Sequence, residues 1–480
     1  MSQSIFRNYI AGEWVEGTSS IENISPADLS DSIGHYAQAD EAQTLGAIDA
    51  AKIGQLEWQE SGLEQRYSVL MAIGDELITR KDELGKLLAR EEGKTLAEGV
   101  GETYRSGQFF HYYAAEVLRQ MGETADSVRP GVEIQTHREP VGVVGIITPW
   151  NFPTATGAWK IAPALAFGNA IVFKPANQVP ASAWALTEII SRQGLPAGTF
   201  NLVMGPGAKV GDVLINSKKI NALTFTGSLE TGRKVAAATA VNLVKCQLEM
   251  GSKNALVVLD DADLDNAVEC AVGGAFFGTG QKCTASSRLI ATEGIHDKFV
   301  DAVIARMKQL VVGHPLKEGV HIGAVADARQ MQQNLDYLAI AKKEGATLAI
   351  GGEVINEETE GYYLQPALFT NTTNDMTINR EEAFAPIACV IKVKDYEEAL
   401  ATLNDTNYGL TGGICTQSLK YANDFKRRAE TGCVMINLPT AGTDYHVPFG
   451  GRKESSFGPR EQGSYAKEFY TIVKTTYMRS

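Results

Sequence analysis

The stretch VGVVGIIT, residues 141–148, followed by PWNFP, residues 149–153, decides the fold. Its continuous apolar run is typical of a strand buried on both faces of a parallel sheet. Helices and strands alternate in the residues that follow. The expected helices span 158–166, 183–192, 210–215 and 229–238, and the expected strands span 170–173, 200–204, 222–225 and 242–248. This alternation predicts an α/β fold with a doubly wound parallel sheet.

A second α/β unit is expected after this sheet. Residues 255–259 favour a strand, 264–277 a helix and 288–291 a further strand. Ahead of the first sheet, apolar residues recur at helical spacing over 63–92, which predicts a pair of helices. The run 468–477 has the pattern of a strand without a partner nearby in the sequence, which suggests pairing with another subunit.

Composition limits the class of protein. The chain has 480 residues, a hydrophobic fraction of 44%, a charged fraction of 21% and a net charge of −13. Its length suggests two or three domains, and its acidity argues against binding nucleic acid or an anionic membrane surface. We expect no signal peptide and no membrane span. The six cysteines show no metal-ligand spacing, so we expect no metal site and a reducing, cytoplasmic location.

Two residues stand out as candidate catalytic groups. Cys283 lies in FGTGQKCT, residues 277–284, and Glu249 lies in LEMG, residues 248–251. Glycines and small polar residues around a thiol favour a loop that a substrate can reach. A thiolate is a strong nucleophile, and a carboxylate can take a proton from the thiol or from a water molecule. The alternative for this pair is a buried cysteine and a surface glutamate.

Polar residues also follow two of the expected strands. Asn151 comes after the 141–148 strand, and Lys174 ends the next one. Ligands bind at the carboxyl ends of strands in an open parallel sheet. There the Asn151 amide could hydrogen-bond a developing oxyanion, and Lys174 could reach a ribose hydroxyl or a phosphate. A proline-rich turn and a solvated lysine are the plainer alternatives.

Glycine-rich loops follow the next two strands. The first, GPGAKVG, spans residues 205–211 and includes Gly207, and the second contains Gly227 and Ser228. Backbone N–H groups and a helix N-terminus can hold a pyrophosphate there, although each loop alone is more often just a tight turn. Two successive loops on one sheet, beside Lys174, favour a dinucleotide site. Further on, Glu382 and Phe384 offer a carboxylate for ribose hydroxyls and a ring beside a nicotinamide.

Taken together, these motifs resemble the aldehyde dehydrogenase superfamily over essentially the whole chain. The resemblance rests on PWNFP (149–153), FKP (173–175), FTGS (225–228), LEMG (248–251) and GQKC (280–283), in this order and at these separations. It implies an NAD(P)-dependent oxidation of an aldehyde to a carboxylate through a cysteine thiohemiacetal and a thioester. The alternative from another class is a non-catalytic, cofactor-binding or structural member. Retention of Cys283, Glu249 and Asn151 argues against that alternative.

The resemblance also implies roles for individual residues. Cys283 would attack the aldehyde, Asn151 and the Cys283 N–H would stabilise the oxyanion, and Glu249 would activate the hydrolytic water. Because Glu249 is present to activate water, an acyl-CoA-forming member is less favoured. The expected cofactor-binding residues are Trp150, Lys174, Asn177, Gly207, Gly227, Ser228, Glu382 and Phe384.

Three longer segments narrow the resemblance. Residues 276–288, 437–449 and 458–463, the last followed by 468–470, are similar to those of 2-oxoglutarate semialdehyde (2,5-dioxopentanoate) dehydrogenases. The competing substrates are succinate or glutarate semialdehyde and a broad range of aldehydes. Succinate semialdehyde dehydrogenases typically carry arginines where Trp159 and Phe277 stand here, which disfavours that substrate. Lys282, Arg288 and Arg460 are candidate anchors for a distal carboxylate by charge alone.

Two further departures concern the cofactor. Asn177 stands where the family often has a glutamate that binds the adenosine ribose and repels a 2′-phosphate. We therefore expect NADP to be accepted beside NAD, or to be preferred to it. Ala383 and Ala385 replace the more usual isoleucine and glycine around Glu382 and Phe384, which affects the expected pose of Glu382.

The expected architecture has two doubly wound domains and a small β element. The NAD(P)-binding domain would comprise residues 1–120 and 140–250, and the catalytic domain residues 251–450. An oligomerisation element would combine residues 121–139 with 451–480, giving a homodimer or homotetramer. Cys283 and Glu249 would meet between the two large domains.

Overall fold

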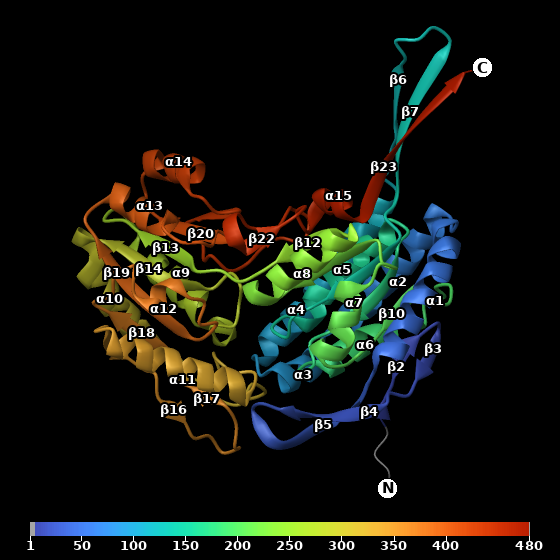
Figure 1. The fold of residues 1–480 in the computed structure, drawn as a ribbon. Helices are drawn as coiled ribbons and strands as arrows, with labels where there is room; N and C mark the ends of the chain where they lie inside the picture. Colours follow the sequence, from blue (N-terminus) through green and yellow to red (C-terminus); the bar gives the residue numbers. More distant parts are fainter. Residues whose placement is uncertain (1–4, 480) are drawn as a thin grey trace.

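The computed structural model describes residues 5–479 and contains two large sheets, each covered by helices (Figure 1). The first sheet has eight strands in the order β22-β12-β11-β8-β9-β10-β2-β3. Its five inner strands, β12 to β10 in that order, are parallel to one another. They are β8 (Val143–Ile147), β9 (Ala170–Lys174), β10 (Phe200–Leu202), β11 (Ala222–Thr226) and β12 (Lys245–Glu249). This arrangement confirms the predicted doubly wound α/β fold.

Alternate residues of β8 face different helix layers. Val144 and Ile146 pack into the core that contains α2, α4, α5 and α6, whereas Val143 and Ile147 pack into the core of α1, α7 and α8. All of β8 is buried, as its apolar run predicts. The helices are α1 (Glu41–Gln59), α2 (Leu63–Thr79), α3 (Lys81–Glu92), α4 (Leu96–Val117), α5 (Pro153–Ala166), α6 (Pro180–Ser191), α7 (Asp212–Asn216) and α8 (Leu229–Asn242). The helix pair predicted over 63–92 corresponds to α2 and α3.

The second sheet has seven strands in the order β15-β18-β19-β14-β13-β20-β21. All its pairings are parallel except that of the edge strand β15. Its strands are β13 (Asn254–Val258), β14 (Ser286–Thr292), β15 (Thr347–Ile350), β18 (Ala367–Thr370), β19 (Ile387–Val393), β20 (Thr411–Cys415) and β21 (Cys433–Ile436). The helices of this half are α9 (Leu264–Ala275), α10 (Glu293–Met307), α11 (Ala328–Lys343), α12 (Thr377–Arg380), α13 (Tyr396–Asn404) and α14 (Leu419–Arg428).

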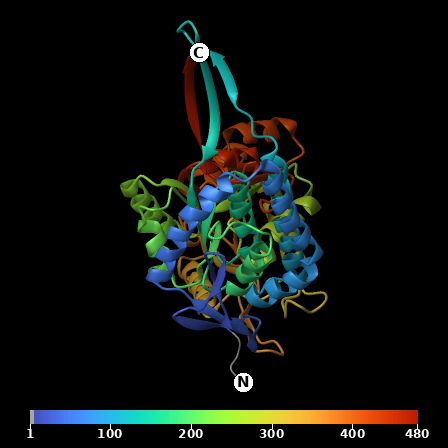
Figure 2. The same cartoon turned by 90° about the vertical axis from the view of Figure 1, so that its right-hand side faces the viewer.

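A third sheet projects from the body of the molecule (Figures 1 and 2). It consists of β6 (Glu123–Asp126), β7 (Val132–Pro140) and β23 (Thr471–Arg479). The predicted C-terminal strand thus begins later than expected, because Lys467–Tyr470 form the short helix α15. Its partner is β7 of the same chain, a distant pairing that local sequence cannot reveal.

Smaller elements complete the fold. Strand β22 (Ser456–Phe457) lies in the range expected for the oligomerisation element and pairs with β12 in the first sheet. The remaining strands are β1 (Ile5–Phe6), β2 (Asn8–Ile10), β3 (Glu13–Val15), β4 (Ser19–Ser25), β5 (Asp28–Gln38), β16 (Val354–Ile355) and β17 (Tyr363–Leu364). Between residues 5 and 479, no helix combines the length and apolar character that crossing a bilayer requires.

Candidate active site

Cys283 lies in the loop between the short helix Phe277–Gly280 and β14. Three successive residues just before this loop, residues 278–280 of the short helix, have positive φ angles. Gly280 must be glycine, because an added Cβ would lie 2.1 Å from the Ala385 carbonyl oxygen. Asn254 Nδ2 donates hydrogen bonds to the carbonyl oxygens of Cys283 (2.7 Å) and Ala285 (3.0 Å). The loop that carries the thiol is therefore fixed on both sides.

Cys283 is half-buried, and two carboxylates influence its thiol. Burial raises the pKa of Cys283 well above its usual range, and the nearby carboxylates Glu382 and Glu249 raise it further. The thiol form therefore predominates at neutral pH, and a nucleophilic role requires a base close to it.

Glu249, at the carboxyl end of β12, is the candidate for that base. Ser456 Oγ donates a hydrogen bond to its Oε2, and Gln247 Nε2 donates one of 3.2 Å to Oε1. Burial raises the pKa of Glu249 well above its usual range, and the neighbouring Glu461 carboxylate adds to the rise. The structure thus brings the predicted pair, Cys283 and Glu249, into one site.

A buried polar network that the sequence analysis missed lies behind Glu249. Lys160 Nζ forms an ion pair with Glu461 and donates a hydrogen bond of 2.7 Å to Thr224 Oγ1. Thr224 Oγ1 in turn donates to Gln247 Oε1 at 2.5 Å, and Gln247 contacts Glu249. The feature of the sequence that could have revealed this network is Lys160, a charged residue inside the apolar sequence of α5.

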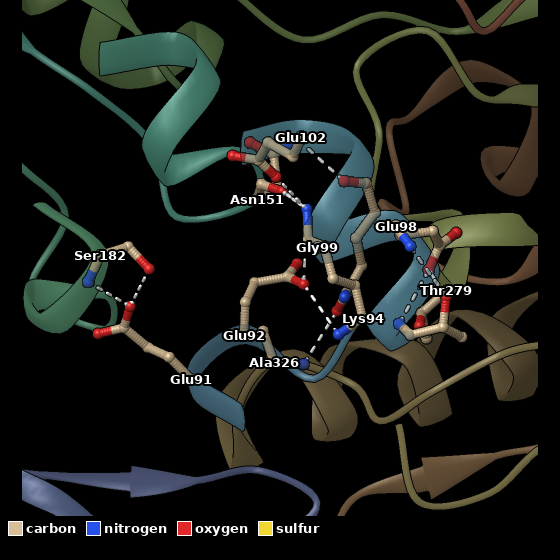
Figure 3. Close-up of polar contacts among 12 residues, drawn as sticks. Glu91, Glu92, Lys94, Glu98, Gly99, Glu102, Asn151, Ser182, Thr279 and Ala326 are labelled. Carbon is tan, nitrogen blue, oxygen red and sulfur yellow. Dashed lines mark hydrogen bonds and ion pairs between the residues drawn. The ribbon is translucent and has the colours of Figure 1, made fainter. Parts of the chain in front are cut away.

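Asn151 is buried at the turn between β8 and α5 and contacts the loop of Cys283. Its Nδ2 donates a hydrogen bond of 2.9 Å to the carbonyl oxygen of Gln281. Its own carbonyl oxygen accepts a hydrogen bond of 2.7 Å from Lys94 Nζ, and Lys94 is paired with Glu102 at 2.7 Å (Figure 3). Glu102 Oε1 also accepts from the backbone N–H groups of residues 154 and 155, at 3.0 Å each. The predicted oxyanion residue therefore contacts the loop that carries Cys283, through one of its two amide N–H groups.

Polar atoms without partners collect at the carboxyl ends of the first sheet. Thr148 Oγ1, Asn177 Oδ1 and Thr226 Oγ1 are buried and have no hydrogen-bond partner among the described residues. They follow β8 and β9 or end β11, which are neighbours in the sheet. Ser228 is the N-cap of α8, next to Gly227. These unused groups fit a polar ligand at the edge where parallel sheets bind nucleotides.

Lys174 and Gly207 border the same edge. Burial lowers the pKa of Lys174 to about 8, and its Nζ donates a hydrogen bond of 2.8 Å to the Pro175 carbonyl oxygen. Gly207 starts a single π-helical turn, Gly207–Gly211, that leads into α7. An added Cβ at Gly211 would lie 3.7 Å from Lys174 Cε, so this loop packs against the lysine stem. An anion bound here would lie close to Lys174, whose ammonium donates only to a neutral carbonyl oxygen among the described residues.

Glu382 and Phe384 lie near Cys283 and near the turn that follows β8. Glu382 Oε1 accepts a hydrogen bond of 2.8 Å from the Ser252 N–H, and burial raises the pKa of Glu382 to about 7. Gly251 makes room for this carboxylate, because an added Cβ there would lie 2.0 Å from Glu382 Oε2. The rings of Phe384 and Trp150 meet edge to face with centroids 5.4 Å apart. The structure therefore groups the carboxylate, the two rings and Cys283.

The three candidate carboxylate anchors are occupied by contacts within the protein. Arg288 is fully buried and donates to the carbonyl oxygens of Lys253, Thr402 and Leu403 and to Asn374 Oδ1. Lys282 Nζ donates a hydrogen bond of 3.1 Å to the Gly273 carbonyl oxygen in α9. Arg460 Nη1 donates to the Gly451 carbonyl oxygen. Arg288 in particular joins elements of the second domain and has a structural role.

Known proteins of similar sequence cover the whole chain. Residues 14–476 match the aldehyde dehydrogenase family. The alpha-ketoglutaric semialdehyde dehydrogenase of Bacillus subtilis is 41% identical over 99% of both chains. The 2,5-dioxopentanoate dehydrogenase of Saccharolobus solfataricus is 38% identical over 98% of both chains. The betaine aldehyde dehydrogenase of Bacillus subtilis is 36% identical over 99% of this chain and 97% of its own.

A solved structure agrees with these matches. Betaine aldehyde dehydrogenase of Staphylococcus aureus, in complex with NAD+, superposes with a TM-score of 0.96 and 33% identity. The superposition covers 100% of this chain and 95% of that chain. Sequence and fold therefore lead to one conclusion: this chain belongs to the aldehyde dehydrogenase family and is an NAD(P)-dependent oxidoreductase.

Proposed function

We propose that this enzyme oxidises 2-oxoglutarate semialdehyde (2,5-dioxopentanoate) to 2-oxoglutarate. The observation that carries the proposal is the match over the full length, at 38–41% identity, to relatives named for this substrate. Relatives named for betaine aldehyde are 36–37% identical, so the margin in identity is small. At the end away from the aldehyde, 2-oxoglutarate semialdehyde has a negative carboxylate and betaine aldehyde has a positive ammonium group. The preferred charge at that end is therefore the property that decides between them.

In this proposal Cys283 is the nucleophile and Glu249 its base. Glu249 accepts the thiol proton as sulfur bonds to the aldehyde carbon, and the oxygen becomes an oxyanion. The Asn151 amide and the Cys283 backbone N–H donate to that oxygen; the Asn151 NH2 has two N–H groups, so one can donate while the other stays on the Gln281 carbonyl. Glu249 passes the thiol proton on to solvent, and only then takes a proton from the water that hydrolyses the thioester.

The NAD(P) site in this proposal comprises the polar atoms at the carboxyl edge of the first sheet. Lys174, Gly207, Gly227 and Ser228 would hold the ribose and phosphates, and Asn177 would contact the adenosine ribose. Glu382 would accept hydrogen bonds from the nicotinamide ribose hydroxyls, with Trp150 and Phe384 near it. The chemistry that a bound nicotinamide would supply is that of a hydride acceptor. The partnerless oxygen of Asn177 supports use of NADP as well as NAD, because an amide does not repel a 2′-phosphate.

A steady-state comparison of aldehydes tests the proposal. We would measure kcat/KM for 2-oxoglutarate semialdehyde, succinate semialdehyde, glutaraldehyde, betaine aldehyde and propanal, each with NAD+ and NADP+. We expect the oxo acid to give the highest value. Equal values for the oxo acid and propanal would reject the substrate, and a higher value for betaine aldehyde would assign the enzyme to the second group of relatives.

We also propose that the enzyme is a homodimer or homotetramer assembled through the projecting sheet. Apolar side chains on β23 are exposed in the single chain, by 47% to 60% of their surface. They are Ile472, Val473, Tyr477 and Met478. A three-stranded sheet with apolar residues on both faces is stabilised by packing against another sheet, and a second copy of this chain offers one.

A further inference from the structure

Arg105, on α4, has a guanidinium that the protein leaves unused. It is half-buried, and among residues 5–479 it has neither an ion pair nor a hydrogen bond. Its Cζ lies 5.3 Å from the centroid of the Tyr445 ring. Stacking on a ring holds a guanidinium in place and leaves its planar N–H edge available for a carboxylate.

Aromatic contacts connect Arg105 with the reaction centre. Tyr445 meets Phe109 with ring centroids 6.4 Å apart, and Phe109 meets Trp159 at 5.9 Å. Trp159 in turn meets Phe449 at 5.8 Å. The next residue, Gly450, adjoins Glu249, since an added Cβ would lie 2.9 Å from Glu249 Oε1. Arg105 therefore lies at one end of a row of aromatic side chains, here called the aromatic wall, and the other end of this row adjoins the proposed base.

The two elements that meet at Arg105 also place it near the proposed catalytic residues. Glu102 lies one helical turn before Arg105 on α4 and holds the turn that follows Asn151. Thr440 Oγ1 donates a hydrogen bond of 2.7 Å to the carbonyl oxygen of Thr284, the residue after Cys283. Tyr445 follows in the same segment. Both the helix and the segment that meet at Arg105 thus also contact the neighbours of the proposed catalytic residues.

Charge around Arg105 favours an external anion. The nearest acid on its own helix, Glu102, is engaged by Lys94 and by two backbone N–H groups. The cations considered from the sequence, Lys282, Arg288 and Arg460, donate to protein carbonyl oxygens instead. A small aldehyde that bears a distal carboxylate has a matching charge and enough apolar chain to lie along the aromatic wall.

We propose that Arg105 binds the distal carboxylate of the substrate and thereby selects semialdehydes of small dicarboxylic acids. The inference rests on the proposed function and adds the residue that recognises the acid end. Two parallel N–H···O bonds fix the carboxylate, and the aldehyde end is thereby directed along the wall toward Cys283. Arg105 is a specificity residue and takes no part in bond making.

The test compares charged and uncharged aldehydes in R105M and R105K. Losing a charge-assisted pair lowers binding about 10- to 100-fold. For R105M we expect kcat/KM to fall by that factor with 2-oxoglutarate semialdehyde and succinate semialdehyde, mostly through KM. With butanal we expect a change below about threefold, and R105K should keep part of the preference. R119M, which removes an exposed arginine just beyond α4, is the matched control and should change nothing.

Binding can be measured apart from chemistry. Glutarate should inhibit the wild type competitively against the aldehyde, and its Ki should rise in R105M by the same factor as KM. If R105M does not fold, R105Q is measured in the same way. An unchanged Ki for glutarate in the folded variant overturns the proposal.

The outcomes separate the two proposals. A wild type that prefers carboxylate aldehydes, with the preference lost in R105M, supports both. A preference that persists in R105M overturns the role of Arg105 and leaves the substrate intact. A wild type with no preference rejects the proposed substrate, and Arg105 as its anchor with it. If R105M lowers kcat/KM equally for butanal and for the acid aldehydes, Arg105 has a structural role and does not bind the carboxylate.

Discussion

Lys94 donates a hydrogen bond of 2.7 Å from Nζ to the backbone carbonyl oxygen of Asn151, so a buried ammonium holds the proposed oxyanion residue. Burial lowers the pKa of Lys94, but Glu102 and Glu92 outweigh that effect and the net pKa is raised. Phe152 packs under the ammonium, 4.1 Å from Nζ to the ring centroid. The charged form is therefore stable in the core, and it ties α4 to the turn that carries Asn151 (Figure 3).

Replacing Lys94 should lower turnover by acting through Asn151. Loss of one oxyanion donor costs about 100- to 1000-fold in kcat, so we expect about that loss for Asn151→Ala and a loss of about tenfold for Lys94→Met. Because both changes affect one group, Lys94→Met in the Asn151→Ala background should cost little more. The measurement is kcat for the two single variants and the double variant. Fully multiplicative effects would contradict the positioning role, and Lys86→Met, on the exposed side of α3, is the control.

Local patterns predicted the elements that carry the site. The apolar run 141–148 predicted β8, and helix–strand alternation placed Asn151 and Lys174 at the carboxyl edge of one sheet. Glycines around Cys283 predicted a loop, and residues 278–280, which lead into that loop, have positive φ angles. These features depend on residues close together in sequence, so periodicity and turn chemistry were sufficient to find them.

Buried charges escaped prediction for a physical reason. A single lysine or glutamate in a helix has the pattern of a solvated side chain, and only its partner shows otherwise. Lys160 meets Glu461 across 301 residues, and Lys94 meets the Asn151 carbonyl across 57. Arg105 was missed because its neighbour Tyr445 lies on a distant segment. The pairing of β23 with β7 was missed for the same reason, because the two strands are far apart in the sequence.

The reactivity of Cys283 should rise steeply with pH. Burial and two nearby carboxylates raise its pKa, so the thiolate fraction is small at neutral pH and grows only in alkaline solution. The rate of alkylation by iodoacetamide without cofactor should increase through pH 9 or so, above the pKa of about 8.5 for an ordinary thiol. Mass spectrometry of the Cys283 peptide gives the rate. A plateau near neutral pH would show that another group activates the thiol in the resting enzyme.

Introducing a carboxylate at Asn177 should turn the enzyme toward NAD. The Oδ1 atom of Asn177 is buried without a partner, and a glutamate there would bind ribose hydroxyls and repel a 2′-phosphate. For Asn177→Glu we expect the NADP+ to NAD+ ratio of kcat/KM to fall at least about tenfold, or about 1.4 kcal/mol. Asn177→Gln keeps the amide and serves as control. A ratio that stays the same in Asn177→Glu would place the adenosine ribose elsewhere.

Charges on the outer strand of the projecting sheet should separate the subunits. Val473 and Tyr477 lie on one face of β23, at an even spacing, and are 59% and 60% exposed in the single chain. Their replacement by glutamate leaves the backbone hydrogen bonds between β23 and β7 in place, so the sheet itself should persist. Light scattering after size exclusion should then report monomers, because burying two carboxylates against an apolar face is costly. Val354→Glu, at an equally exposed valine on β16, controls for added surface charge and should leave the oligomer unchanged. An oligomer that survives in the Val473→Glu, Tyr477→Glu variant would mean that the subunits associate through another surface.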